Sequence, residues 1–152
     1  MKKIQFLLPV VLLIAVACNN SGKTTANDLE KQADSLYKDI MHGHDIGMAK
    51  GQAVEKATEF TQKAIDSISK LPAAAQQAAA GYKQQLDSLL KDLNYADFSM
   101  NKWMEEMKWD PSKIELNERI KYYTEEKMKV EKVKDAILNS LAQADSLLKT
   151  KF

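Results

Sequence analysis

A histidine and two methionines are the residues whose types and spacing could bind a metal ion. His44 and Met48 are four residues apart, so a helix would place them on one face. Met100 could join them from a second segment, and an imidazole nitrogen with thioether sulfurs suits Cu(I). Methionines at helical spacing are more often adaptable core residues. We therefore expect a packing layer here, with copper binding by these three side chains as the alternative.

The sequence carries no pattern typical of catalysis. Its one cysteine, Cys18, has another expected use, and there is no Gly-rich phosphate loop or Glu-x-x-His pair. Asp45 and Asp97 could form a carboxylate pair, although acidic residues on helices mostly face solvent. We expect no catalytic residues and no enzymatic activity.

Composition bounds the size of the domain and the class of its partners. The chain has 152 residues, of which 45% are hydrophobic and 28% charged, enough for one elongated core. Its formal charge is +1, and without Lys2 and Lys3 it has 20 of its 22 basic residues against 21 acidic ones. We therefore expect no nucleic-acid partner.

The start of the chain has the pattern of a bacterial signal peptide. Lys2 and Lys3 precede an apolar stretch at residues 6–16, which is too short to span a bilayer, and small residues at 15–17 directly precede Cys18. This order resembles a lipobox, in which the cysteine is acylated and becomes the first mature residue. We predict a lipoprotein signal peptide at residues 1–17, lipidation at Cys18, and a flexible tether over residues 18–27. The alternative is an ordinary secretory signal with a chance cysteine.

This anchor predicts a place in the cell and a set of partners. Asn19 and Asn20 supply no acidic cluster after Cys18, which favours the outer membrane facing the periplasm over export to the surface. The expected partners are the membrane through the lipid anchor, and either envelope proteins or further copies of this chain.

The periodicity of apolar residues predicts helices throughout residues 28–152. One three-four spaced seam runs through the middle of the chain: Leu86, Leu89, Leu93, Ala96, Met100, Trp103 and Met107. Pro72 and the Asp110-Pro111 pair mark two corners, so we expect helices at about 28–71, 73–108 and 112–150. The predicted fold is all-α, an elongated antiparallel three-helix bundle with coiled-coil-like packing.

Counting outward from Pro72 predicts one layer across the bundle. It places His44 opposite Met100, and counting from the second corner brings a tyrosine to the same level. His44 would be hydrogen bonded within a mixed polar layer, to Asp97 or to a tyrosine hydroxyl. The expected members of this structural or binding layer are His44, Asp45, Met48, Asp97, Met100, Trp103, Met104 and Tyr123.

Three glycines recur every four residues at Gly43, Gly47 and Gly51, where each costs about 1 kcal/mol relative to alanine in a helix interior. We expect them to form a shelf against which Trp103 and Met100 pack, on a helix that is continuous though bent. The competing interpretation is that the glycines break the first helix.

Two motifs give the chain a family resemblance. Residues 44–48 (HDIGM) are similar to an H-D-x-x-M motif, and residues 96–104 (ADFSMNKWM) to an A-D-x-x-M-x-x-W-M motif, of small Bacteroidota envelope lipoproteins often labelled viral A-type inclusion protein. Residues 126–144 resemble their third helix. The resemblance implies a helical envelope lipoprotein with a binding or structural role and no established activity. The three glycines depart from the pattern, since larger residues are expected there.

Overall fold

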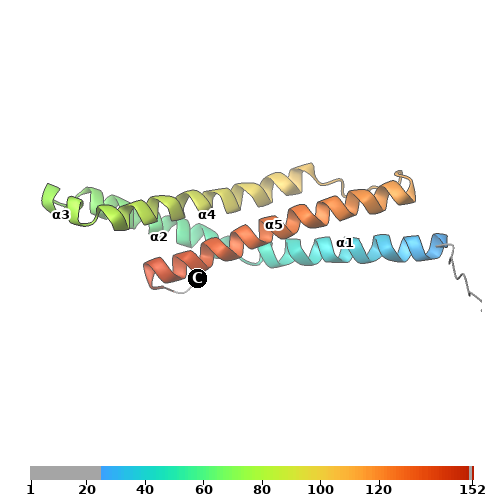
Figure 1. Cartoon of the computed structure of the whole chain (residues 1–152), viewed down its shortest axis with the longest axis horizontal. Coiled ribbons are helices and arrows are strands. Elements are labelled where there is room, and N and C mark those ends of the chain that lie inside the picture. The colour runs from blue at the N-terminus through green and yellow to red at the C-terminus, as the bar shows by residue number, and fades with distance from the viewer. Residues whose placement is uncertain (1–24, 151) are drawn as a thin grey trace, which may run out of the picture.

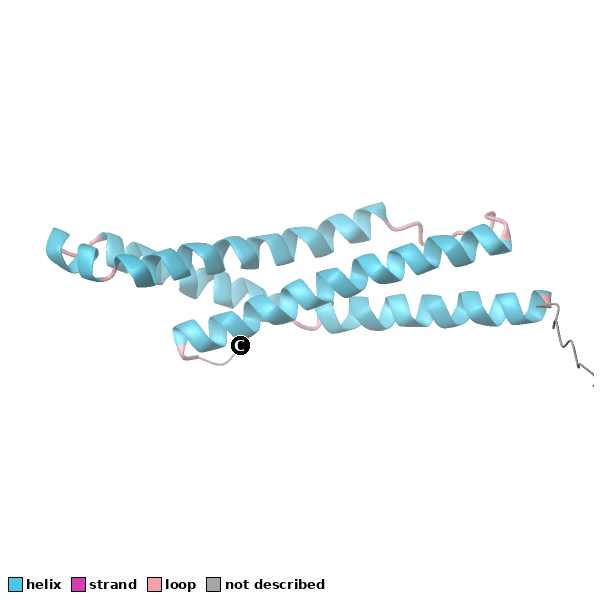
Figure 2. Ribbon diagram, in the orientation of Figure 1, coloured by secondary structure: helices cyan, strands magenta, loops and turns pink. Residues whose placement is uncertain are grey.

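The computed structural model describes residues 25–150 and 152, and this part of the chain is all α-helical (Figure 2). The helices are α1 (Ala26–Met48), α2 (Gly51–Ser69), α3 (Ala73–Ala78), α4 (Ala80–Glu106) and α5 (Leu116–Leu148). The predicted all-α class is therefore confirmed. The predicted signal peptide, Cys18 and most of the predicted tether lie outside the described residues.

The helices are arranged along one long axis (Figure 1). Helices α1 and α2 follow one another along this axis, α4 returns beside α2, and α5 turns back again. Helix α1 packs mainly on α5, α2 packs mainly on α4, and α5 contacts α1, α2 and α4. Direct contact between α1 and α4 is limited, so the long helix α5 joins the two halves of the rod.

The first helix begins at a capping box. The Thr25 hydroxyl accepts a hydrogen bond from the Asp28 backbone N–H at 3.2 Å, and the Asp28 carboxylate accepts one from the Thr25 backbone N–H at 3.1 Å. These bonds satisfy two of the backbone donors that a helix start leaves free. Hydrogen bonding from Thr25 also lowers the pKa of the Asp28 carboxyl.

The prediction of one continuous helix over residues 28–71 is wrong. Helix α1 ends at Met48 and α2 begins at Gly51, with Ala49 and Lys50 between them. The Lys50 N–H reaches back only three residues, to the Gly47 carbonyl oxygen at 3.0 Å, so the α-helical pattern is interrupted. The break has a local cause, because glycine on both sides of it makes helix continuation less favourable.

The two corners fall where the prolines predicted them, although the helix ends differ from the prediction. After Pro72 the chain forms the short helix α3 before α4 starts, and the Gln76 side chain closes the corner by donating to the Leu71 carbonyl oxygen at 2.7 Å. At the second corner the Asp110 carboxylate accepts from the Ser112 N–H at 3.1 Å. This local turn delays the start of α5 to Leu116, four residues later than predicted.

The predicted apolar seam of residues 86–107 is confirmed, because all seven of its members are buried. Two lysines of α5 are partly buried, and their charges are paired. Lys127 bonds to Asp39 on α1 at 2.6 Å, and Lys134 pairs with Glu131 on its own helix. A long lysine side chain can cover apolar surface in this way while its ammonium group stays wet.

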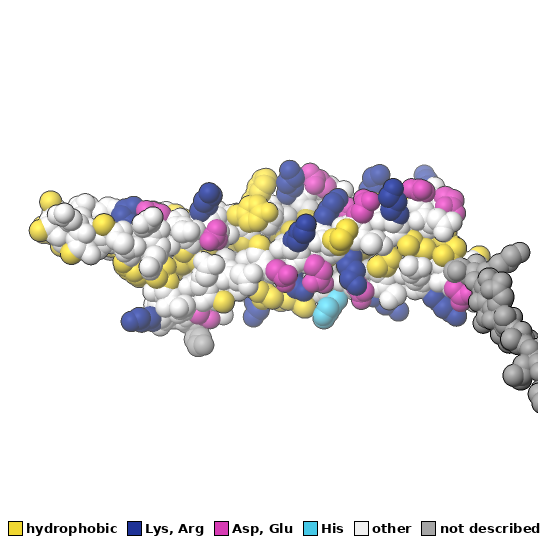
Figure 3. Space-filling view, viewed as in Figure 1, with side chains coloured by type: hydrophobic (Ala, Val, Ile, Leu, Met, Phe, Trp, Pro, Cys, Tyr) yellow, Lys and Arg dark blue, Asp and Glu magenta, His cyan; other side chains and the backbone are white. Residues whose placement is uncertain are grey.

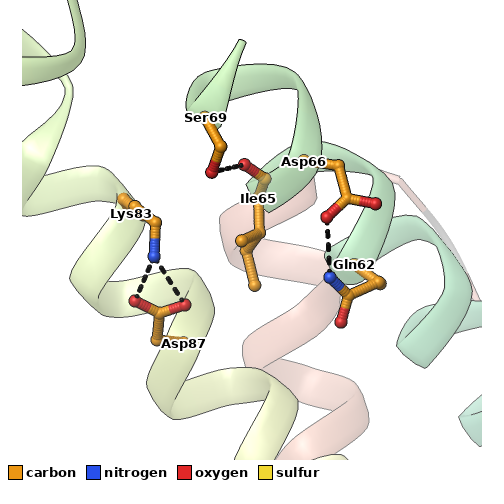
Figure 4. A network of polar contacts seen from close by, with 6 residues as sticks. All are labelled: Gln62, Ile65, Asp66, Ser69, Lys83 and Asp87. Carbon is orange, nitrogen blue, oxygen red and sulfur yellow. Dashed lines mark hydrogen bonds and ion pairs between the residues drawn. The ribbon is translucent and has the colours of Figure 1, made fainter.

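The polar contacts drawn in Figure 4, on α2 and on α4, stay within single helices. On α2 the Gln62 amide donates to Asp66 at 2.8 Å, and on α4 Lys83 pairs with Asp87 at 2.8 Å. Such pairs on a helix surface contribute only a few tenths of a kcal/mol each. The packing of α2 on α4 therefore depends on buried apolar residues such as Ile65, Ile68 and Leu86.

Candidate functional site

A buried hydrogen bond between two helices stands at the centre of the predicted layer. The Trp103 indole Nε1 on α4 donates to Oε2 of Glu126 on α5 at 2.9 Å, and the two residues are only 4% and 3% exposed. The other buried polar residues, Thr61 and Ser140, bond to carbonyl oxygens of their own helices. Glu126 is thus the one buried polar residue of the described chain whose side chain reaches another helix.

Lys129 neutralises this buried carboxylate. Its ammonium group lies 2.7 Å from Oε1 of Glu126, one helical turn further along α5. The hydrogen bond to Glu126 raises the pKa of the Lys129 ammonium group. A buried carboxylate is tolerated when it is both paired and hydrogen bonded, and here each of its oxygens has a partner.

His44 packs with two indole rings in a cluster of three rings. Its ring centroid is 5.9 Å from that of Trp103 and 6.1 Å from that of Trp109, and the two indoles are 5.9 Å apart in an edge-on contact. Nδ1 of His44 is within hydrogen-bond distance, 2.9 Å, of the Asp45 carboxylate. The predicted partners of this histidine, Asp97 or a tyrosine hydroxyl, are therefore wrong, because the adjacent carboxylate is nearer along its own helix.

The contact of the first segment with α4 is offset by one turn from the prediction. Counting from Pro72 paired His44 with Met100, whereas the ring contact pairs His44 with Trp103, three residues further along α4. Gly47 takes the position opposite Met100 instead. The break after Met48 changes the length of the segment before Pro72, and the separate helix α3 changes the length of the segment after it. Counting residues outward from Pro72 does not include either change.

The predicted glycine shelf is not formed as a unit. A Cβ added at Gly47 would lie 2.3 Å from the Met100 terminal methyl, so this glycine does permit a close approach. Gly43 instead faces Val130 on α5, and nothing lies within 4 Å of the Cβ position at Gly51. The helix break separates Gly51 from the other two, so only Gly47 has the role expected of all three.

Two of the proposed copper ligands, Met48 and Met100, border one small hollow next to the helix break. The hollow has a volume of about 90 Å³, and Asp97 and Asn101 are also among its lining residues. His44 is not among its lining residues. No group of three or more His, Cys, Asp or Glu side chains within residues 25–150 is arranged to hold a metal ion. Copper binding stays a prediction that the geometry does not test.

Tyr123 lies outside the layer where the sequence placed it. It is buried against Tyr37 on α1, with ring centroids 5.6 Å apart, and against Tyr122, at 5.9 Å. Burial raises the pKa of both Tyr122 and Tyr123. Glu126, one turn further along α5, occupies the position opposite Trp103 that the prediction assigned to a tyrosine. The remaining member of the predicted layer, Met104, is half-buried, and its carbonyl oxygen accepts from the Trp109 indole at 3.2 Å.

An open groove between α4 and α5 has Trp103 among its lining residues. We call it the α4–α5 groove, and its volume is about 350 Å³. Its principal lining residues are Tyr95, Phe98, Lys102, Trp103, Lys129, Lys132 and Val133. Figure 3 shows hydrophobic side chains gathered over the middle of α4, with basic side chains around them. This patch is the largest exposed aromatic feature on α4, since Tyr95 and Phe98 are 62% and 60% exposed.

The sequence prediction missed Glu126 and Trp109, which both contact Trp103. Glu126 lies three residues after Tyr123 and four before Val130, so it fits the apolar seam as well as Lys127 does. A carboxylate on the seam, with a tryptophan on the facing helix, is the signal that could have found it. Trp109 had no such signal, because it lies in the irregular segment between α4 and α5.

Comparison with known proteins found no relative of this chain. No family model, curated protein or solved structure matches the chain. Within the described residues, none of the helices is both long enough and apolar enough to cross a membrane.

Proposed function

We propose that this protein is an envelope lipoprotein that is anchored by acyl chains on Cys18 and whose helical rod binds a partner. The observation that carries the binding role is the α4–α5 groove, where two aromatic rings stay more than half exposed beside three lysines. Contiguous exposed apolar surface with a polar border is typical of interaction sites. The anchor is supported by the sequence, in which small residues directly precede Cys18.

The proposal includes a definite architecture for the rod. The segment α1–α2, the segment α3–α4, and α5 would form one elongated antiparallel three-helix bundle with coiled-coil-like packing. The contacts of α5 with α1, α2 and α4 support this arrangement. Trp103 and Glu126 would fix the register of α4 against α5, as single buried polar groups do in some coiled coils.

The resemblance to small Bacteroidota envelope lipoproteins belongs to the same proposal. Residues 44–48 and 96–104 carry the two motifs, and the contact of His44 with Trp103 brings them together in space. On this basis the protein would reside in the outer membrane, facing the periplasm, and act without catalysis.

Cell fractionation tests the proposal. The wild-type chain, expressed in a bacterial host, is expected in the membrane fraction and labelled by radioactive palmitate. The Cys18→Ser variant is expected to lose the label, because it lacks the sulfur to which the lipid is attached. Recovery of unlabelled wild-type chain in the aqueous fraction would overturn the anchor.

Copper binding is the second candidate function, and one observation favours it. Met48 and Met100 border the same small hollow, which can bring two thioether sulfurs toward one ion. Titration of the chain with Cu(I) under reducing conditions separates the two functions. Submicromolar binding that is lost in His44→Ala would support a copper protein that uses His44, Met48 and Met100, and no binding would remove this candidate.

A further inference from the structure

We propose that the α4–α5 groove binds an acidic amphipathic helix of a partner protein. This inference rests on the binding role proposed above and names the chemistry of the partner. It depends on three features of the groove, which are its shape, its aromatic side chains and its charge.

The length and the lining of the groove suit a bound helix. It lies between two long helices that pack along the axis of the rod, and residues from both helices line it. Its lining residues on α4 extend from Tyr95 to Glu106, which corresponds to about 16 Å at 1.5 Å per residue, or three turns of a bound helix. Trp103 and Val133, both buried in the core, form its apolar floor.

Two aromatic side chains of the groove project from α4 and are more than half exposed. Tyr95 and Phe98 are three residues apart on α4 and face the same side. No other aromatic ring in the described residues packs on either, and the Lys102 ammonium group lies 5.9 Å from the centre of the Phe98 ring. Exposed aromatic rings beside an apolar floor are the anchors that dominate many protein interfaces.

The charge of the groove selects an acidic partner. Lys102 borders it on α4 and Lys132 borders it on α5, whereas the ammonium group of Lys129 is already paired with Glu126 and the one carboxylate in the lining is Glu106. Lys102 is only loosely paired with Glu106, at 3.6 Å, and Lys132 makes no ion pair with any described residue. A helix with an apolar stripe and carboxylates on both sides of it would match the floor and both lysine borders.

The same features argue against two other occupants. A second copy of the chain docked face to face would bring two lysine-bordered surfaces together, which is unfavourable. A lipid surface is flat and would touch the projecting rings of Tyr95 and Phe98 while leaving the floor at Trp103 and Val133 uncovered. A helix reaches both the rings and the floor.

Two synthetic peptides test this inference by fluorescence anisotropy. Both are about 18 residues long with leucine at positions i, i+3, i+4 and i+7, and they differ only in having glutamate or lysine at the flanking positions. They are titrated with the full chain carrying Cys18→Ser, and with the wild-type chain in phosphatidylcholine nanodiscs. If the two preparations bind the peptides equally, peptide binding does not depend on the lipid anchor. The proposed anchor and the proposed peptide-binding groove can then be rejected separately.

The acidic peptide is expected to bind at least about tenfold more tightly than the basic one, a difference of 1.4 kcal/mol. Phe98→Ala should weaken its binding by about tenfold or more. The matched control is Phe60→Ala, which removes a half-exposed ring on α2 and should change binding by less than about twofold. Circular dichroism of each variant checks that the helices are retained.

Several results would overturn the inference. One is the absence of saturable binding of the acidic peptide up to about 100 µM, which is weaker than a specific interface requires. Equal binding of the two peptides, or binding that Phe98→Ala leaves unchanged, would also do so. Phosphatidylglycerol vesicles bound through Phe98 in place of the peptide would assign the groove to a lipid surface. A dimer in sedimentation that Phe98→Ala dissociates would assign it to a second copy.

Discussion

The indole Nε1 of Trp103 donates to Oε2 of Glu126 at 2.9 Å, and this bond joins α4 to α5 inside the apolar core. The carboxylate also pairs with Lys129 at 2.7 Å, so neither of its oxygens is left without a partner. The stability of the middle of the rod therefore depends on a polar pair in an otherwise apolar seam.

Trp103→Phe is expected to destabilise the protein by about 2 to 3 kcal/mol, because it removes the donor to a buried carboxylate and reduces packing volume. Urea denaturation followed by circular dichroism measures the change. Trp109→Phe is the control, because Trp109 is half-exposed and should cost less than about 1 kcal/mol. Equal losses in the two variants would show that the bond to Glu126 is not important for stability.

Two substitutions at Glu126 separate its roles. Glu126→Gln keeps an oxygen that can accept from Trp103 and loses the ion pair with Lys129, so we expect a loss of about 1 kcal/mol. Glu126→Ala leaves the indole N–H unpaired beside a cavity, for which we expect about 2 to 4 kcal/mol. Thermal and urea unfolding of both variants test this order, and the account is wrong if alanine is tolerated as well as glutamine.

The glycines at the helix break should respond differently to substitution. Gly51→Ala meets nothing within 4 Å and should stabilise the protein by up to about 1 kcal/mol. At Gly47 a Cβ would lie 2.3 Å from the Met100 terminal methyl and 3.2 Å from Cδ1 of Ile137, so the larger, branched side chain of Gly47→Val should cost about 2 kcal/mol. Unfolding measurements that give both positions the same sign would contradict this packing.

Stability should fall in alkaline solution. The pKa values of Tyr122 and Lys129 are raised in the folded chain, mainly by burial and by the hydrogen bond to Glu126 respectively. A group whose pKa is raised in the folded chain contributes stability that is fully present at pH values below its pKa in the unfolded chain. That pKa is about 10 for tyrosine and about 10.4 for lysine. This stability is lost as the pH rises through the folded values.

The free energy of unfolding should therefore be lower at about pH 11 than at about pH 9. Urea denaturation at these two pH values measures the change. Tyr122→Phe removes one of the titrating groups and should make the decline smaller. An unchanged free energy of unfolding across this range would mean that these groups titrate alike in the folded and unfolded chain.

The apolar periodicity was sufficient to predict much of the fold. The seam from Leu86 to Met107 is buried as predicted, because a three-four spacing on a helix necessarily forms one face. Proline at 72 and 111 located both corners, since it cannot continue a helix interior. The meeting of His44 with the segment around Trp103 was also anticipated, although one turn out of register.

The remaining features depend on contacts that periodicity does not encode. Lys127 and Glu126 fit the seam equally well, and only the facing indole of Trp103 makes Glu126 the buried one. Trp109 reaches His44 from an irregular segment, whose path follows from local turns such as that at Asp110. The break after Met48 reflects the balance between weak helix propensity and packing on α5, which cannot be decided from spacing.

The most direct test of the proposed function is the mass of the mature N-terminal peptide, measured on protein extracted from the membranes of a bacterial host. We predict a chain that begins at Cys18 and carries a thioether-linked diacylglyceryl group on its sulfur. A mature chain that begins at another residue, or one that retains an unmodified Cys18 thiol, would contradict the assignment as a lipid-anchored envelope protein.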